Sequence, residues 1–226
     1  MIKKYKLSIN TGFAVNRFNN NEIFINFVKN YLKLNYIQPT SDWLNMNLPD
    51  RYIFKNVKQL DKTLNKYNVK INSLFTGAFT RLNHLGHPDK EHQMYWVNWF
   101  KRLIDVGIDL GANHVGSHLG ILSYHDNKQR KKLLKTRIIK NWHLIGEYAY
   151  KKKIKSLIWE PMSISREFGE TLNECNQIHS LLNGKKYKFN LCLDVGHGDI
   201  NSKNKSNYDP YKWLEKFSNE SPVIHI

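Results

Sequence analysis

The sequence predicts an α/β fold: a TIM (β/α)8-type barrel that is incomplete, with about seven strands and six helices. Short apolar runs alternate with longer amphipathic segments from one end of the chain to the other, which is typical of βα units around a parallel sheet. No Pro/Gly/Ser-rich linker interrupts this alternation, so we expect residues 1–226 to form one domain. A complete barrel needs about 250 residues, so we expect the final strand and helices to be missing. An open doubly wound sheet is the structural alternative.

The first half of the chain carries four predicted strands separated by three predicted helices. We expect the strands at residues 6–9, 35–39, 69–77 and 113–120. We expect the helices at residues 22–33, 51–67 and 87–111. In the second of these helices, apolar residues recur every three or four positions from Ile53 to Tyr67. In the third, Pro88 suits the first turn, and Gly107 or Gly111 suits the end.

The second half continues the same alternation. We expect helices at residues 129–153, 169–184 and 209–219, and strands at residues 156–161, 189–199 and 221–226. Lysines close the first of these helices, where they oppose the negative end of the helix dipole, and Gly184 suits the end of the second. The chain therefore stops on a seventh predicted strand.

The charge of the chain raises the question of nucleic-acid binding. Lys and Arg number 35 against 19 Asp and Glu, which gives a formal net charge of +16. However, 28 of the basic residues are Lys and 27 residues are Asn, and both types are scattered along the sequence. This pattern indicates a compositional bias rather than a phosphate-binding face, so we disfavour a nucleic-acid partner.

Cysteine usage and hydropathy indicate a soluble cytoplasmic protein. The two cysteines, Cys175 and Cys192, are too few for a disulfide framework and lack metal-knuckle spacing, so we expect both to be reduced core residues. The N-terminal residues contain no apolar run of signal-peptide length, and no segment approaches the ~18 apolar residues of a membrane span. We expect no membrane partner.

Polar residues with chemical potential follow successive predicted strands. They are His118, Glu160, Asp194, His197 and His225. In a TIM barrel the carboxyl ends of the strands form the active-site rim, and a carboxylate there is costly to bury unless it is paired or binds a metal. Carboxylates and imidazoles converging on one rim suit a divalent metal ion such as Mn²⁺, Co²⁺, Mg²⁺ or Zn²⁺. The alternative for Asp194 and His197 is a strand-end turn with an internal hydrogen bond.

Four of these strand ends carry a recognisable motif series. HLG (118–120), WEP (159–161), LDVGH (193–197) and IHI (224–226) resemble, in order, the xylose isomerase-like TIM-barrel superfamily of sugar and sugar-phosphate isomerases and epimerases. FTGAFTRLNHLGHPD (75–89), VGSHLG (115–120) and IWEPMSISREFGET (158–171) are most similar to the D-erythrulose 1-phosphate 3-epimerase type.

The resemblance implies roles for individual residues. Glu160, Asp194 and His225 would be metal ligands, and His197 would orient the substrate. Glu160 would also move a proton as the catalytic residue, against a second glutamate on an eighth strand, in a reaction through an enediolate. We place His118 among the substrate-binding residues. The implied substrate is a small ketose or ketose phosphate, and relatives of this kind commonly pair into homo-oligomers.

One departure from the family pattern concerns the substrate. Six residues beyond the metal-binding glutamate, where sugar-only epimerases usually have another glutamate, this chain has Arg166. An arginine here can bind a phosphate through two nitrogens, which favours a phosphorylated sugar. The alternative is an exposed arginine paired with Glu167 or Glu170.

A second departure is that the sequence ends at Ile226, before an eighth strand. We therefore expect weak or no turnover from this chain, whether it is a fragment or a truncated relative. Two other functions remain: a truncated inactive barrel, and an endonuclease IV-like enzyme that cuts DNA at abasic sites. The nuclease pattern has a histidine where this chain has Thr76 and Gly77, which counts against a three-zinc site.

Overall fold

The computed structural model describes residues 5–18, 20–78, 81, 84–199 and 201–226. The chain divides into two compact units. Unit 1 comprises residues 1–80 and 103–115, and unit 2 comprises residues 81–102 and 116–226. The expectation of a single domain remains a prediction.

Unit 1 contains a three-stranded sheet of short parallel strands. Its order is β1 (Ile9–Asn10), β2 (Tyr36–Gln38) and β3 (Lys70–Ile71). The first strand begins three residues later than predicted, since residues 5–8 are exposed and Ile9 is the first to pair with β2. The predicted strand 69–77 is divided by a bend at Asn72, so that β4 (Ser73–Phe75) is a separate strand.

Two helices of unit 1 lie where their periodicity predicts them. Helix α1 (Asn21–Asn26) begins at Asn20, whose side chain accepts hydrogen bonds from two backbone N–H groups of the first turn. It continues as a π-helical turn over Phe27–Tyr31. Helix α2 (Asp50–Tyr67) buries the apolar face predicted from its 3/4 spacing and ends at Asn68, which has a positive φ of 50°.

Helix α3 (Lys90–Asp109) begins three residues later than predicted. The Asp89 carboxylate accepts a hydrogen bond from the backbone N–H of Glu91, so Asp89 caps the first turn. At the other end, Gly111 has a φ of +72°, and this left-handed residue ends the helix rather than Gly107.

The second sheet has five strands in the order β4-β5-β6-β7-β8. Its later strands are β5 (His114–His118), β6 (Ser156–Glu160), β7 (Phe189–Asp194) and β8 (Val223–His225). β6, β7 and β8 are parallel. Each of these strands lies within the range that its apolar run predicts.

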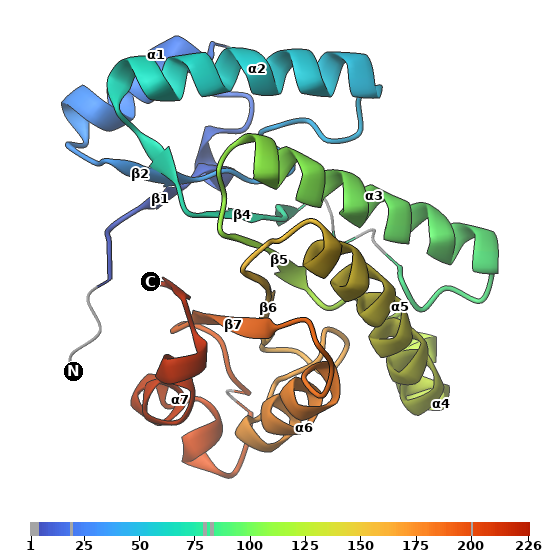
Figure 1. Cartoon of the computed structure of the whole chain (residues 1–226). Helices are drawn as coiled ribbons and strands as arrows, with labels where there is room; N and C mark the ends of the chain where they lie inside the picture. Colours follow the sequence, from blue (N-terminus) through green and yellow to red (C-terminus); the bar gives the residue numbers. More distant parts are fainter. Residues whose placement is uncertain (1–4, 19, 79–80, 82–83, 200) are drawn as a thin grey trace. The chain divides into compact units, whose positions relative to one another are not determined.

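The helices of unit 2 pack on these strands. Helix α5 (Lys131–Lys151) contacts β6, while α6 (Leu172–Leu182) and α7 (Pro210–Phe217) contact β7 (Figure 1). The short helix α4 (Tyr124–Gln129) was not predicted, because six residues are too few to show helical periodicity. Cys175 and Cys192 are free and buried, as predicted. Among the described residues, no helix is both long and apolar enough to cross a bilayer.

Gly198 allows the chain to turn closely after β7. Its φ is +138°, and a Cβ atom there would lie 2.4 Å from the backbone oxygen of Asn207. Gly184 has a similar φ of +150°, but a Cβ atom there would meet nothing within 4 Å. A side chain at either position would therefore be strained by the backbone conformation. Only a side chain at position 198 would also clash with backbone atoms.

We expect Gly198→Ala to reduce the free energy of unfolding by about 1–3 kcal/mol, from strain plus overpacking. Gly184→Ala is the matched control and should cost less, because it adds strain alone. Urea unfolding followed by circular dichroism measures both variants. Equal losses in the two variants would contradict the close approach of Gly198 to Asn207.

Candidate active site

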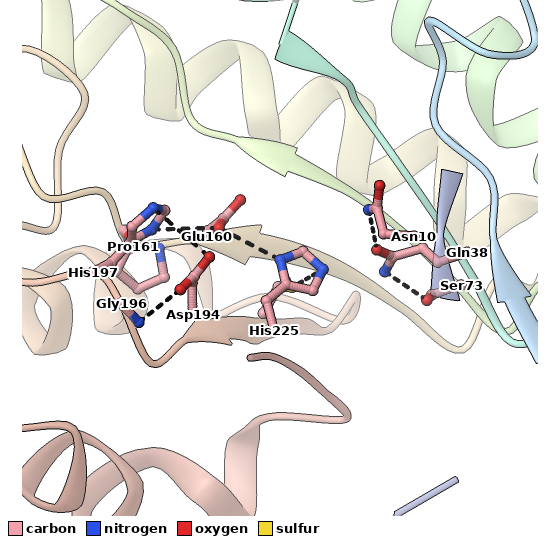
Figure 2. A network of polar contacts seen from close by, with 10 residues as sticks. Asn10, Gln38, Ser73, Glu160, Pro161, Asp194, Gly196, His197 and His225 are labelled. Atoms are coloured by element: carbon pink, nitrogen blue, oxygen red, sulfur yellow. Dashed lines mark hydrogen bonds and ion pairs between the residues drawn. The ribbon is translucent and has the colours of Figure 1, made fainter. Parts of the chain in front are cut away.

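Three predicted metal ligands meet at one edge of the sheet. Glu160 ends β6, Asp194 ends β7 and His225 ends β8. Asp194 and His225 are direct partners in the β7–β8 register. One ligand atom from each of the three side chains lies within 4.8 Å of the other two (Figure 2). Parallel strands thus bring together residues that are far apart in sequence.

The charges at this edge favour a cation. Glu160 is 8% exposed, and its Oε1 atom lies 3.6 Å from His225 Nδ1. Burial alone lowers the pKa of His225, but the hydrogen bond to Glu160 and the charges of Glu160 and Asp194 raise it above its ordinary value. The raised pKa shows that the carboxylates stabilise a positive charge at His225.

The Asp194 carboxylate is held by the turn that follows β7. Its Oδ1 atom accepts a hydrogen bond of 2.7 Å from the backbone N–H of Gly196. This is the strand-end turn considered as the alternative to a functional role. It is compatible with metal binding, because it fixes one carboxylate oxygen and the carboxylate has further lone pairs on the other.

His197 lies beside both carboxylates. Its Nδ1 atom is 3.1 Å from the carbonyl oxygen of Pro161 and 3.4 Å from Glu160 Oε1, while its Nε2 atom is 3.8 Å from Asp194 Oδ2 (Figure 2). A bond from Nδ1–H to the Pro161 carbonyl leaves the lone pair of Nε2 to accept a hydrogen bond. His197 is therefore placed to contact a ligand bound between the carboxylates.

The sulfur of Cys192 lies on the other side of His225. Cys192 Sγ is 3.5 Å from His225 Nε2, and burial raises the pKa of the thiol well above its usual range. Cys192 is thus a neutral packing neighbour of the histidine rather than a thiolate ligand.

His118 ends β5 as a buried, neutral imidazole. Its side chain is 5% exposed, and burial, helped by the charge of Arg81, lowers its pKa to about 4. Its Nε2 atom is buried and has no hydrogen-bond partner among the described residues. Buried polar atoms are rarely left unpaired, so this nitrogen is suited to a bound ligand.

Arg166 holds two loops together. One guanidinium nitrogen, Nη1, donates a 3.0 Å hydrogen bond to the carbonyl oxygen of Leu122, and the backbone N–H of Leu122 donates to the carbonyl oxygen of Arg166. Within the described chain, neither Arg166 nor His118 forms a hydrogen bond or ion pair with the three predicted metal ligands. Their substrate-binding roles remain predictions.

Two residues near this edge had no clear signal in the sequence. Glu167 is almost completely buried, and its Oε1 atom lies 3.2 Å from Arg81 Nη1. Arg81 lies in the segment 75–89, and four of its neighbours, residues 79–80 and 82–83, lie outside the described residues. Arg81 does not stand directly after a predicted strand. Only the motif resemblance of residues 75–89 therefore indicated this segment.

Comparisons with known proteins find related sequences. The Xylose isomerase-like TIM barrel family matches residues 31–217. The chain is 36% identical over 225 residues to D-erythrulose 1-phosphate 3-epimerase of Brucella abortus (strain 2308), covering 97% of this chain and 72% of that protein.

Solved structures share the fold. A Rhodospirillum rubrum protein described as a proposed xylose isomerase has a TM-score of 0.89 at 24% identity, covering 99% of this chain and 77% of that one. A xylose isomerase-like TIM barrel protein from Mycobacterium smegmatis, in complex with magnesium, has a TM-score of 0.63 at 17% identity, covering 85% of this chain and 65% of that one. The predicted incomplete TIM-type barrel is confirmed.

We expect His118 to make the stability of the protein depend on pH. Its folded-state pKa of about 4 lies below the ordinary value of 6.5, so the unfolded chain binds more protons between these values. The contribution is therefore fully present above pH 6.5, and up to about 3 kcal/mol is lost as the pH falls to 4.

His118→Gln should remove this part of the acid loss in urea unfolding at neutral and acidic pH. The exposed His125 provides the control, since His125→Gln should keep the wild-type pH dependence. A His118→Gln protein that loses as much stability on acidification as the wild type would exclude a buried neutral His118.

Proposed function

Because this chain belongs to the xylose isomerase-like TIM barrel family, we propose that it is a divalent-metal-dependent epimerase of a small ketose phosphate, with D-erythrulose 1-phosphate as the first substrate to test. The chain is a sugar-phosphate isomerase or epimerase, the class of its 36% identical relative. The observation that supports the metal-dependent step is the convergence of Glu160, Asp194 and His225 at the ends of three adjacent strands.

The donor set fits a divalent cation. Two carboxylates and one imidazole are ligands that Mn²⁺, Co²⁺, Mg²⁺ and Zn²⁺ all accept. The carboxylates stabilise a positive charge at His225. The same negative potential would attract a metal cation. A cation held by these residues would stabilise the negative charge that develops on the substrate oxygens as a carbon-bound proton leaves.

Glu160 is the residue that we assign to the proton transfer. Its carboxylate takes the proton from the carbon beside the ketone, and the electron pair of the broken C–H bond forms the C=C bond of an enediolate while the ketone oxygen becomes negative. Return of a proton to the opposite face gives the epimer. The family resemblance assigns that return to a glutamate on the barrel strand after the one that carries the histidine ligand, which is β8 here.

Two histidines complete the proposed site. His197 Nε2, with Nδ1 held by Pro161, is placed to hydrogen-bond a substrate hydroxyl beside Asp194. His118 stays neutral at physiological pH and offers an unpaired nitrogen for a second polar group. Both act as orienting groups, which raises the effective concentration of the reacting carbon at Glu160.

The abasic-site nuclease is less well supported. In the described part of the chain, one group of three potential ligands is close enough to hold a metal ion. Thr76 follows β4 as a buried residue at the position where the nuclease pattern has a histidine. One metal and a carboxylate suit enolisation of a ketose better than three-zinc cleavage of a phosphodiester.

We expect the protein with Mn²⁺ to exchange the C3 hydrogen of D-erythrulose 1-phosphate with solvent deuterium. This readout follows the Glu160 half-reaction by itself and does not require the second acid. Glu160→Gln should reduce the exchange rate about 10²–10⁴-fold, the usual contribution of a general base. Proton NMR measures the exchange.

Glu215→Gln is the control, because the Glu215 side chain is 70% exposed on α7. It should exchange at the wild-type rate. If Glu160→Gln also exchanges at that rate, Glu160 is not the base.

A further inference from the structure

Glu167 is a buried carboxylate that the proposed reaction does not use. Its side chain is 1% exposed, and burial raises its pKa. A carboxylate at such a position is costly unless a positive charge compensates it. Among the described residues the ion-pair partner is Arg81, with Nη1 at 3.2 Å from Oε1, and no well-aligned hydrogen bond reaches that oxygen.

Arg81 has the opposite environment. Its side chain is 47% exposed, so the guanidinium has a buried carboxylate on one side and solvent on the other. The guanidinium carries five N–H donors in a rigid plane, and the contact with Glu167 involves one nitrogen. The remaining donors are preorganised for an anion.

The pair lies within the electrostatic reach of the strand-end residues in unit 2. The charge of Arg81 lowers the pKa of His118, after the larger effect of burial. Burial is also the main influence on the pKa of Glu167, followed by the charges of Arg81 and Arg166 and then by those of His197 and Glu160. Arg81 thus presents its positive charge to the same region as the proposed catalytic groups.

Arg166, the arginine that the sequence favoured for phosphate binding, is engaged differently. It is partly buried, and its Nη1 donates to the Leu122 carbonyl. This contact fixes the loop that follows β6, directly before Glu167.

We propose that Arg81, positioned by Glu167, binds the phosphate group of the substrate, while Arg166 acts mainly by holding the loop that carries Glu167. This inference rests on the proposed function in that the substrate is a ketose phosphate. A dianionic phosphate matches the paired N–H groups of a guanidinium, and an arginine already aligned by a buried carboxylate loses little side-chain freedom on binding it. The Arg81–Glu167 pair would thus select phosphorylated over free ketoses.

The test measures the binding of inorganic phosphate by isothermal titration calorimetry. Arg81→Gln should weaken binding at least about tenfold, because a charge-assisted two-point contact is lost, and Arg81→Lys should restore part of it. Arg51→Gln is the control, since Arg51 is exposed on α2 and should not affect phosphate binding. Because Arg81→Gln leaves the buried Glu167 carboxylate without its positive partner, thermal unfolding checks that this variant is folded, and Arg81→Lys, which keeps the charge, serves as the second variant.

Kinetics add a second readout. For the hydrogen exchange of D-erythrulose 1-phosphate, Arg81→Gln should raise KM with little change in kcat. Glu167→Gln should shift KM in the same direction as Arg81→Gln, because it removes the charge that positions the guanidinium.

The outcomes separate this inference from the proposed reaction. Phosphate binding that depends on Arg81, even without hydrogen exchange at the ketose, supports the phosphate site and rejects the reaction. A wild-type protein that does not bind phosphate overturns the inference. So does loss of binding in Arg166→Gln with full binding in Arg81→Gln.

Discussion

The parallel register of β6, β7 and β8 is the constraint on which the site depends. Because Asp194 and His225 are direct partners and Glu160 ends the adjacent strand, three candidate metal ligands that are far apart in the sequence lie together. Side chains alternate between the faces of a strand, so a shift of one residue in either pairing would point a ligand to the other face. The helices that pack on β6 and β7 therefore support the chemistry by holding this register.

Burial then determines how these groups behave. The carboxylates at the strand ends raise the pKa of His225, whereas burial, helped by the charge of Arg81, lowers the pKa of His118 to about 4. The surroundings of these two histidines on one sheet thus shift their pKa values in opposite directions. Burial also distinguishes the two members of the Arg81–Glu167 pair. The carboxylate is almost fully buried, whereas the arginine that it is proposed to orient is about half exposed.

Much of this arrangement could be predicted from the sequence, because strand ends are marked by an apolar run followed by a polar residue. Glu160, Asp194 and His225 each follow such a run, and the structure brings them together. The division of the strand 69–77 at Asn72 could not be predicted, since apolar residues stand on both sides of Asn72 and the bend depends on which strand each half pairs with. Arg81 and Glu167 were not identified either, because their pairing joins two loops and has no periodicity.

Glu160, Asp194 and His225 are proposed to form one metal site, and Mn²⁺ binding followed by electron paramagnetic resonance tests this most directly. We expect one Mn²⁺ per wild-type chain and an affinity at least about tenfold lower in Asp194→Asn, since a charged ligand is lost. Asp109→Asn, at an exposed position near the end of α3, should bind like the wild type. Mn²⁺ binding of wild-type strength in Asp194→Asn would contradict the account.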